Sequence, residues 1–373
     1  MVDGAVRAMV QTGPNEVALQ ELARPELGRD EALIRVEACG ICGSDIVMFH
    51  APVPGFFEFP VIRGHEPVGT IEAVGPGFAA RTGHAVGDRV AVDPFLRCGI
   101  CDHCLGGHGE LCQGDPQRRH NNYSMIPLHE GSGLWGGFAT HLVATGNTVL
   151  YPVPAEVPPT RAALFNALGA GVKWTADVGG ATLGSTVVVL GCGQRGLACA
   201  TVAMEVGASF VAVTGLSTDA HKLDIARELG VDAAIDIGVE NPVEAIAARF
   251  PDGVDLVIDT TPKTPSAVAD AISMVRIGGT IVLAGMKHER ADVPVDVLVR
   301  KEITVRGVLG TGADHYRRAI AMIARSSRPL DRLTTHVLPL EEVERGIQLL
   351  EGRVPGEHAL AVVISPDASA VRG

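Results

Sequence analysis

The stretch "STVVVLGCGQRGLACATVAMEVGA", residues 185–208, decides the fold class of this chain. A short apolar run predicts a buried strand, a glycine-rich turn follows it, and a segment of helical period comes next. This order of strand, turn and helix is the one that holds a dinucleotide pyrophosphate on a helix N-terminus. A purely structural glycine turn is the alternative, and the order of elements favours the nucleotide site. The turn has the pattern G-x-G-x-x-G and consists of Gly191, Gly193, Gln194, Arg195 and Gly196, with Cys192 after the first glycine.

The residues around this turn repeat the same alternation of elements. From about residue 162 to 310, runs such as "FVAVTG", "GVDLVIDT" and "GGTIVLAG" alternate with segments of helical period such as "AHKLDIARELG". Strands that are apolar on both faces and separated by helices predict a parallel sheet covered on both sides. We therefore expect an α/β, doubly wound domain of the Rossmann type.

The end of the second expected strand bears on the choice between NAD and NADP. An acidic residue about twenty residues after the turn commonly binds the adenosine ribose. Here Gly215 stands at that place, and Asp219 follows four residues later. Gly215 leaves room for a 2′-phosphate, whereas Asp219 could still reach a ribose diol. NAD(H) and NADP(H) both remain open, with a slight preference for NADP. Side chains that could hydrogen-bond a 2′-phosphate are Ser217, Thr218, His221 and Lys222.

The chain has a different texture before residue 160. Short β-like runs such as "EALIRVEACG" and "VGTIEAVGPG" are cut by Gly and Pro, which predicts an irregular, β-rich domain. A length of 373 residues also suits two domains of ordinary size.

Composition excludes some classes of function. The formal net charge of −12 argues against a nucleic-acid binder, because phosphate backbones are held by surplus Lys and Arg. No apolar run approaches the length of a membrane helix, and the N-terminus lacks a signal-peptide pattern. We expect a cytosolic protein without a membrane or nucleic-acid partner.

Four of the eight cysteines lie close together in the sequence "CGICDHCLGGHGELC". Their spacing, C-x2-C-x2-C-x7-C, allows four thiolates on one loop to surround Zn²⁺ and leave no position open for substrate. A redox dithiol and an iron–sulfur cluster are the alternatives. His103 and His108 lie within the loop, and we expect them to face solvent. The predicted structural zinc ligands are Cys98, Cys101, Cys104 and Cys112.

A second candidate metal site is spread over two segments, "CGICGSD" and "RGHEPVG". A thiolate, Cys42, and an imidazole, His65, suit a catalytic zinc that keeps one coordination position open. Each residue alone would more often be a packed thiol or a hydrogen-bonded histidine. Their combination with a dinucleotide-binding domain favours the metal.

The motifs "GICGSD", "GHE", the four-cysteine loop, "GGFATH" and "GCGQRG", in this order, resemble the zinc-dependent medium-chain alcohol and polyol dehydrogenases. The resemblance covers essentially the whole chain. It implies a GroES-like catalytic domain over 1–165, a Rossmann NAD(P)-binding domain over 166–308, and a return to the catalytic domain over 309–373. It also implies a homodimer or homotetramer with two zinc ions per subunit, one catalytic and one structural.

The resemblance further implies roles for single residues. Cys42 and His65 look like ligands of a catalytic zinc, Ser44 looks like the hydroxyl that takes the substrate proton, and Asp45 resembles a residue that orients a ligand. The implied reaction is hydride transfer between an alcohol or carbonyl substrate and NAD(P), with zinc as Lewis acid.

Two positions depart from the family pattern. Many relatives carry a proton-relay His five residues after the motif cysteine, whereas this chain has Val47 there and His50 as the nearest His. Relatives also supply a third ionised zinc ligand near "ALFNALGAGVKW", where this chain has Asn166. An amide oxygen is a poorer zinc ligand than a carboxylate. Asn166 could bind weakly, Glu66 could be the third ligand, or the site could hold zinc poorly. We favour Glu66, with Asn166 near the metal through water or substrate.

The substrate class is less constrained. Aromatic residues gather just ahead of His65, and they could line an apolar pocket or pack within their own domain. A polyol or amino-alcohol dehydrogenase is an alternative function, and a nucleotide-binding relative with impaired catalytic zinc and no enzymatic role is a second one. The candidate pocket residues are Phe56, Phe57, Phe59, Trp135 and Trp174.

Overall fold

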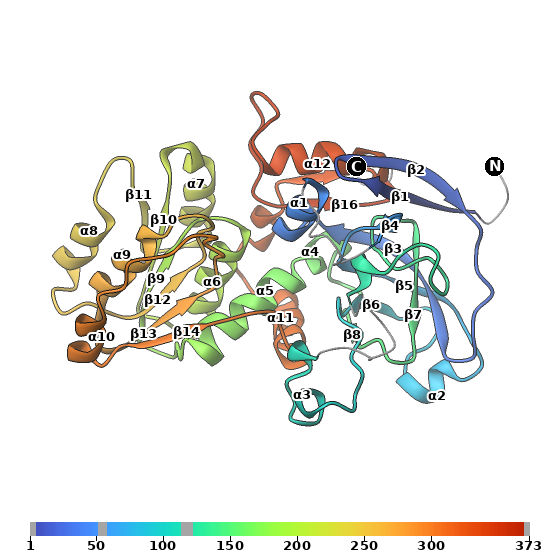
Figure 1. Cartoon of the computed structure of the whole chain (residues 1–373), viewed down its shortest axis with the longest axis horizontal. Helices are drawn as coiled ribbons and strands as arrows, with labels where there is room; N and C mark the ends of the chain where they lie inside the picture. Colours follow the sequence, from blue (N-terminus) through green and yellow to red (C-terminus); the bar gives the residue numbers. More distant parts are fainter. Residues whose placement is uncertain (1–4, 51–57, 113–121, 369–373) are drawn as a thin grey trace. The chain divides into compact units, whose positions relative to one another are not determined.

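The computed structural model describes residues 5–50, 58–112 and 122–368 (Figure 1). The chain forms two compact units. The first contains Met1–Phe165 and Thr334–Gly373, and the second contains Asn166–Leu333. Within the described ranges, none of the helices combines the length and apolar character that a membrane span requires.

The second unit contains a six-stranded parallel sheet in the order β11-β10-β9-β12-β13-β14, which confirms the predicted α/β class. Its central strands are buried almost throughout, because helices cover the sheet and its side chains form one core. The strands are β9 (Thr186–Leu190), β10 (Phe210–Gly215), β11 (Ala233–Asp236), β12 (Val254–Asp259), β13 (Val275–Leu283) and β14 (Thr304–Gly307).

The helices of this unit alternate with its strands, as the sequence pattern predicts. The first helix continues into a seven-residue π-helix, η3 (Val172–Val178). The α-helices are α5 (Phe165–Gly171), α6 (Gln194–Glu205), α7 (Ala220–Leu229), α8 (Pro242–Arg249), α9 (Ser266–Met274), α10 (Val295–Lys301) and α11 (Ala313–Arg325). Two short 3-10 helices are η4 (Ser217–Asp219) and η5 (Leu330–Leu333).

The first unit is β-rich, as predicted, and is built on two sheets. The smaller has the order β2-β1-β4, and the larger has the order β15-β16-β3-β5-β6-β8, with β7 also paired to β3. The strands are β1 (Val6–Gly13), β2 (Glu16–Leu22), β3 (Glu31–Gly40), β4 (Val61–Ile62), β5 (Glu66–Val74), β6 (Arg89–Val92), β7 (His141–Thr145), β8 (Leu150–Pro152), β15 (His336–Leu338) and β16 (Val362–Ile364).

Short helices connect these strands. The α-helices are α1 (Gly43–His50), α2 (Phe78–Thr82), α3 (Asp102–Leu105), α4 (Pro159–Ala162) and α12 (Val343–Leu350). The 3-10 helices are η1 (Gly109–Leu111), η2 (Tyr123–Met125) and η6 (Leu340–Glu342).

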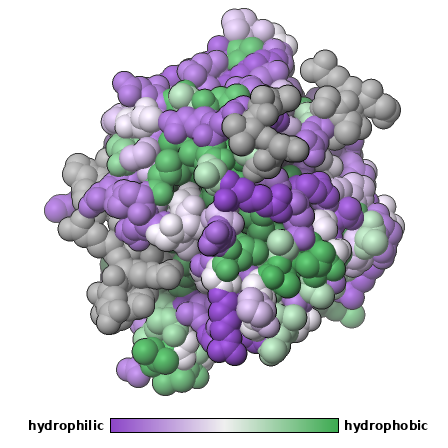
Figure 2. All heavy atoms as spheres, turned by 90° about the vertical axis from the view of Figure 1, so that its right-hand side faces the viewer, coloured by the Kyte–Doolittle hydropathy of each residue, from purple (hydrophilic) through white to green (hydrophobic). Residues whose placement is uncertain are grey.

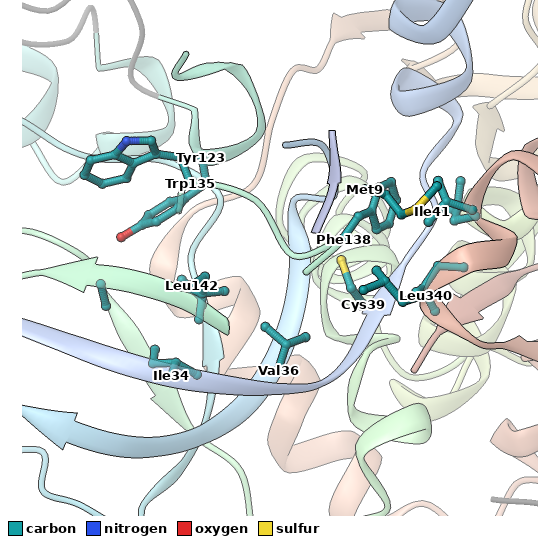
Figure 3. Packing of buried hydrophobic residues seen from close by; sticks show 14 of the residues in the cluster. Met9, Ile34, Val36, Cys39, Ile41, Tyr123, Trp135, Phe138, Leu142 and Leu340 are labelled. Carbon is teal, nitrogen blue, oxygen red and sulfur yellow. The ribbon is translucent and has the colours of Figure 1, made fainter. Parts of the chain in front are cut away.

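The main core of the first unit includes Trp135, one of the candidate pocket residues (Figure 3). Its ring lies beside that of Tyr123, with centroids 5.9 Å apart, and its Nε1–H donates to the Glu130 carbonyl at 2.7 Å. Trp135 is only 4% exposed. The structure therefore places this indole within the hydrophobic core of its own unit.

The second unit ends at Leu333 and the first unit resumes at Thr334, whereas the resemblance implied a return at residue 309. The cause is the packing of α11 within the second unit. A Cβ on Gly169 would lie 2.7 Å from the Tyr316 ring, so the absence of a side chain there lets α5 and α11 approach closely. The Tyr316 hydroxyl also donates to the Asn166 side chain at 3.3 Å.

One face of the molecule is drawn in Figure 2. Hydrophilic and hydrophobic side chains are mixed across it. Such mixing is ordinary for the surface of a folded protein, because apolar atoms contribute a large share of any protein surface.

Candidate active site and metal centres

The four clustered cysteines surround one point within the loop that carries α3 and η1. The Cys112 sulfur lies 3.6 Å from that of Cys98 and 4.0 Å from that of Cys101, and the sulfurs of Cys98 and Cys104 are 4.0 Å apart. A disulfide requires about 2 Å. Four sulfurs each about 2.3 Å from a zinc ion would lie about 3.8 Å apart along the edges of a tetrahedron. The donor set therefore fits zinc.

Backbone hydrogen bonds prepare these sulfurs to bind a cation. The Cys98 N–H donates to the Cys112 sulfur and the Cys101 N–H donates to the Cys98 sulfur, each at 3.4 Å. A backbone hydrogen bond from Cys104 is the largest cause that lowers the pKa of the Cys101 thiol, to about 6. Burial, by contrast, raises the pKa of the Cys104 thiol to about 12. Because the thiolate is the form that binds metal, the shift that favours a cation is the one at Cys101.

The loop is anchored by the residue that precedes its first cysteine. Arg97 donates through Nη2 to the Asp93 carboxylate at 2.6 Å. Asp93 is fully buried and also accepts from the Tyr151 hydroxyl at 2.5 Å and the Phe95 N–H at 3.0 Å. Burial raises the pKa of Asp93, although Arg97 and Tyr151 oppose the shift. This buried ion pair ties one end of the cysteine loop to the sheet.

Cys42, His65 and Glu66 form the second cluster, and their ligand atoms all lie within 4.8 Å of one another. Cys42 lies between β3 and α1, and Glu66 is the first residue of β5. The antiparallel register pairs Gly40 of β3 with Glu66, which brings the two segments together. A Cβ on Gly40 would lie 2.3 Å from Glu66 Oε2, so this glycine gives the carboxylate the room that it occupies.

Asp45 orients the ligands of this second cluster. Its Oδ1 lies 3.3 Å from His65 Nδ1, and its Oδ2 accepts from the Cys42 N–H at 3.0 Å. Arg63 Nη2 lies 3.5 Å from the same carboxylate, and Arg63 also donates to the Ser124 carbonyl. A proton on His65 Nδ1 directed at Asp45 leaves the Nε2 lone pair for a metal.

The electrostatics of this cluster are dominated by buried charges. Burial raises the pKa of Asp45, but His65 and Arg63 outweigh it and lower that pKa below its ordinary value. Burial lowers the pKa of His65, but Asp45 and the Cys42 thiolate outweigh it and raise that pKa well above its ordinary value. The pocket therefore stabilises positive charge between Cys42 and Asp45, where the imidazole lies.

Ser44 and His50 lie at opposite ends of α1. Ser44 is exposed in the first turn, whereas His50 is the last residue of the helix. Six residues of helix span about 9 Å. His50 Nδ1 contacts Asn15 Oδ1, and His50 Nε2 lies 2.8 Å from Glu351 Oε1. Val47 is 53% exposed. The two contacts of His50 therefore lie at the opposite end of α1 from Ser44.

The glycine-rich turn has the geometry that the sequence predicts, between β9 and α6. Gly191 has a φ of +100°, which side chains other than glycine rarely adopt. A Cβ on Gly196 would lie 1.9 Å from the Gly191 carbonyl oxygen, whereas one on Gly193 would meet nothing within 4 Å. Gly196 therefore allows close helix packing, and Gly193 leaves open space beside the helix N-terminus. Gln194 and Arg195 are the first two residues of that helix.

The strand end after this turn carries two carboxylates. Gly215 ends β10 and pairs in register with Asp236 of β11. Ser217 Oγ donates to Asp236 at 2.7 Å, and Lys222 Nζ lies 2.7 Å from Asp219 Oδ1. Two of the side chains expected to meet a 2′-phosphate therefore already contact carboxylates.

Asn166 is the first residue of the second unit and is 4% exposed. Its side-chain oxygen accepts from both terminal nitrogens of Arg195 and from the Tyr316 hydroxyl, each at 3.3 Å. Trp174 lies in η3, with its ring centroid 5.9 Å from the Arg195 guanidinium carbon. Phe59 is partly buried. Phe56 and Phe57 lie outside the described residues.

Three further residues emerge only from the structure: Arg63 beside Asp45, Asp236 beside Ser217, and Tyr316 beside Asn166. Arg63 stands next to the motif "GHE", which is the one signal that the sequence offers for it. Asp236 and Tyr316 come from strands and helices that no motif marks. Their roles depend on contacts between segments far apart in the chain.

Comparison with known families matches both units. Residues 28–155 match the alcohol dehydrogenase GroES-like domain, and residues 195–325 match the zinc-binding dehydrogenase domain. A protein of Mycobacterium tuberculosis named probable alcohol dehydrogenase is 38% identical, over 98% of this chain and all of the relative. An erythritol/L-threitol dehydrogenase of Mycolicibacterium smegmatis is 31% identical, over 97% of this chain and 98% of the relative.

A solved structure agrees with these matches. A zinc-binding dehydrogenase from Sinorhizobium meliloti, bound to NADP, is 28% identical with a TM-score of 0.84, and covers 97% of this chain and 99% of its own. The enzyme interpretation is therefore supported over the alternative of a relative without catalysis. With the two metal clusters and the dinucleotide turn in place, the chain belongs to the zinc-binding medium-chain alcohol dehydrogenase family and is an enzyme of that family.

Proposed function

We propose that this enzyme transfers a hydride between an alcohol or carbonyl substrate and NAD(P), at a zinc ion held by Cys42, His65 and Glu66. The observation that carries this proposal is the convergence of these three ligand atoms within 4.8 Å. The hydrogen bond from His65 to Asp45 supports it, because it fixes the imidazole with one nitrogen available to the metal.

Glu66 is proposed as the third ligand in preference to Asn166. The Glu66 carboxylate is fully buried in the cluster, whereas the Asn166 oxygen accepts three hydrogen bonds from Arg195 and Tyr316. One thiolate and one carboxylate together balance the charge of Zn²⁺. Asn166→Asp tests this choice, since a ligand at that position would bind zinc more tightly as a carboxylate.

Residues of this chain are also proposed to transfer the proton that the alcohol releases. Zinc bound there supplies a Lewis acid that lowers the pKa of a coordinated alcohol. Ser44, exposed and two residues beyond Cys42, is proposed to take the alcohol proton first. Because His50 contacts Asn15 and Glu351, the proton is proposed to leave Ser44 through cofactor ribose hydroxyls or water. Ser44→Ala should lower kcat by about 10²-fold or more, as general acid–base groups do, with little change in dinucleotide affinity.

NADP is proposed as the preferred cofactor, by a small margin. Gly215 places no carboxylate at the end of β10, and the Sinorhizobium meliloti relative binds NADP. Asp219 and Asp236 favour NAD instead, since these carboxylates contact Lys222 and Ser217, which could otherwise bind a 2′-phosphate. Dissociation constants for NADPH and NADH, followed by those of Asp236→Asn, would measure the balance. Removal of this carboxylate should strengthen NADPH binding more than NADH binding.

The substrate is proposed to be a small alcohol or its carbonyl partner, with a polyol or amino alcohol as the alternative. The alternative is favoured by the Glu66 ligand and by the erythritol/L-threitol dehydrogenase among the relatives. Rates with aliphatic, benzylic and polyol alcohols, followed at the absorbance of the reduced nicotinamide, would separate the two. Zinc analysis of the same preparation should give two ions per chain.

A homo-oligomer in the cytosol is proposed as the working form. The strand β14 ends the six-stranded sheet, and all four of its residues are exposed. An exposed strand edge is a template for pairing with another chain. Apolar side chains of β13 and α10 are also exposed, including Ile277 at 66% and Val299 at 71%. Light scattering after gel filtration would distinguish a dimer from a tetramer, and a charged substitution at Val305 should shift the mass towards the monomer.

A further inference from the structure

Hydrogen bonds join Asn166 to Arg195 and Tyr316, which are residues of the same unit. The Asn166 backbone carbonyl accepts from Arg195 Nη1 at 2.7 Å. Its side-chain oxygen accepts from Nη1 and Nη2 of the same guanidinium and from the Tyr316 hydroxyl, each at 3.3 Å. One buried residue at the start of α5 therefore contacts side chains of both α6 and α11.

Arg195 connects this network to the dinucleotide turn. It is the second residue of α6 and stands between Gly193 and Gly196 in the glycine-rich motif. Its guanidinium also lies 5.9 Å from the Trp174 ring centroid, within the range of a cation–π contact. An amide on one element and an indole on another thus restrict a long, flexible side chain to one orientation.

An amide and a carboxylate at position 166 would affect the dinucleotide turn differently. The first turn of a helix after a G-x-G-x-x-G motif binds the pyrophosphate of a dinucleotide, which carries negative charge. A carboxylate at position 166 would orient Arg195 equally well, but it would add a negative charge at hydrogen-bond distance from the guanidinium. The amide orients Arg195 and contributes no charge of its own.

We propose that Asn166 is a positioning residue of the dinucleotide site, which holds Arg195 at the start of α6 and thereby strengthens binding of the cofactor pyrophosphate. This assignment rests on the proposed function in so far as the turn binds NAD(P). It gives the amide at position 166 a role that requires no contact with a metal.

A double-mutant cycle on the whole enzyme tests the proposal. Dissociation constants for NADPH and for ADP-ribose, which has the pyrophosphate but no nicotinamide, are measured for Asn166→Ala, Arg195→Ala and the double variant. Each single substitution should weaken both ligands by about tenfold, as expected for a hydrogen bond to a charged group. The double variant should be no weaker than Arg195→Ala, because Asn166 acts through Arg195.

Asn166→Asp provides a variant of nearly the same shape that keeps the hydrogen bonds. It should weaken NADPH and ADP-ribose and flatten the salt dependence of their binding, while the zinc content stays equal to that of the wild type. Arg249→Ala is a matched control, because Arg249 also stacks on an aromatic ring in this unit, 4.5 Å from the Phe210 centroid. It should leave both dissociation constants unchanged.

Several outcomes would overturn the assignment. Additive losses in the cycle, or an ADP-ribose affinity that Asn166→Ala leaves intact, would show that Asn166 does not act on the pyrophosphate. Tighter zinc binding in Asn166→Asp with unchanged NADPH affinity would make residue 166 a metal ligand instead. If the wild type itself bound neither NADPH nor NADH, the proposed function would fail as well. That failure appears in the wild type, whereas a failure of the assignment appears only in the variants.

Discussion

The two metal clusters of the first unit differ in how the chain assembles them. The four-cysteine cluster is contained within one loop of the chain, from Cys98 to Cys112. Cys42 and His65, by contrast, come from separate segments that meet because β3 and β5 pair with Gly40 opposite Glu66. A compact loop makes a metal centre that depends mainly on its own residues. A centre assembled from the ends of strands depends on the sheet.

The surroundings of the two clusters differ as well. Three of the four loop cysteines are partly exposed, whereas His65 and Glu66 are buried. The second cluster has a buried carboxylate, Asp45, that contacts the His65 side chain and the Cys42 backbone. A closed, four-thiolate site suits stabilisation, and a three-ligand site with positioned neighbours suits chemistry.

The largest effect is expected from Cys42→Ser. Loss of the thiolate should lower kcat by about 10³-fold or more, since the substrate oxygen loses its Lewis acid, and zinc should fall from two ions to one per chain. Turnover and zinc content of the purified variant measure both. Cys199→Ala, which removes a buried thiol in the other unit, is the control and should keep both ions. Full activity in Cys42→Ser would remove this cluster from the mechanism.

A smaller effect is expected from Asp45→Asn, which keeps the shape but removes the charge opposite His65. Zinc affinity at the catalytic centre should fall by about 10- to 100-fold, because the imidazole loses the partner that fixes its orientation. Competition with a chelator would measure the affinity. An unchanged affinity would mean that the assembled centre is as independent of its neighbours as the loop.

Cys104→Ser should separate stability from activity. The zinc ion of the cysteine loop should be lost, and the melting temperature should fall by about 5–10 °C, since the metal no longer holds the loop together. The turnover of the folded variant should change by less than about threefold. Calorimetry and zinc analysis test this, and a loss of turnover as large as that of Cys42→Ser would contradict a purely structural role for the loop.

The smallest effect is expected from Arg97→Gln, which breaks the ion pair with Asp93 at the start of the loop. Because Asp93 stays buried, the melting temperature should fall by about 2–4 °C while both zinc ions remain. Arg24→Gln is the control, since Arg24 pairs with Glu72 in an exposed contact and such pairs contribute little. Equal shifts in the two variants would mean that the loop needs no anchor.

Several features could be predicted because their causes are local. Gly191 needs its positive φ and Gly196 needs room beside the Gly191 carbonyl oxygen, and these two positions lie within one short stretch of the chain. The spacing of Cys98, Cys101 and Cys104 likewise encodes a loop. The expected return at residue 309 differs from the division at Thr334, because α11 shows no sequence signal for the side on which Tyr316 packs.

Patterning along the chain was thus sufficient for the α/β class, the dinucleotide turn, the four-cysteine loop and the candidacy of Cys42 and His65. The pairing of strands decided that Glu66 meets Cys42 and that Asp45 faces His65. Packing decided that the Asn166 oxygen meets Arg195 and Tyr316. Spacing between neighbouring residues limits where a turn or loop can place its side chains. Contacts between distant segments depend on register and packing, which no short stretch of sequence specifies.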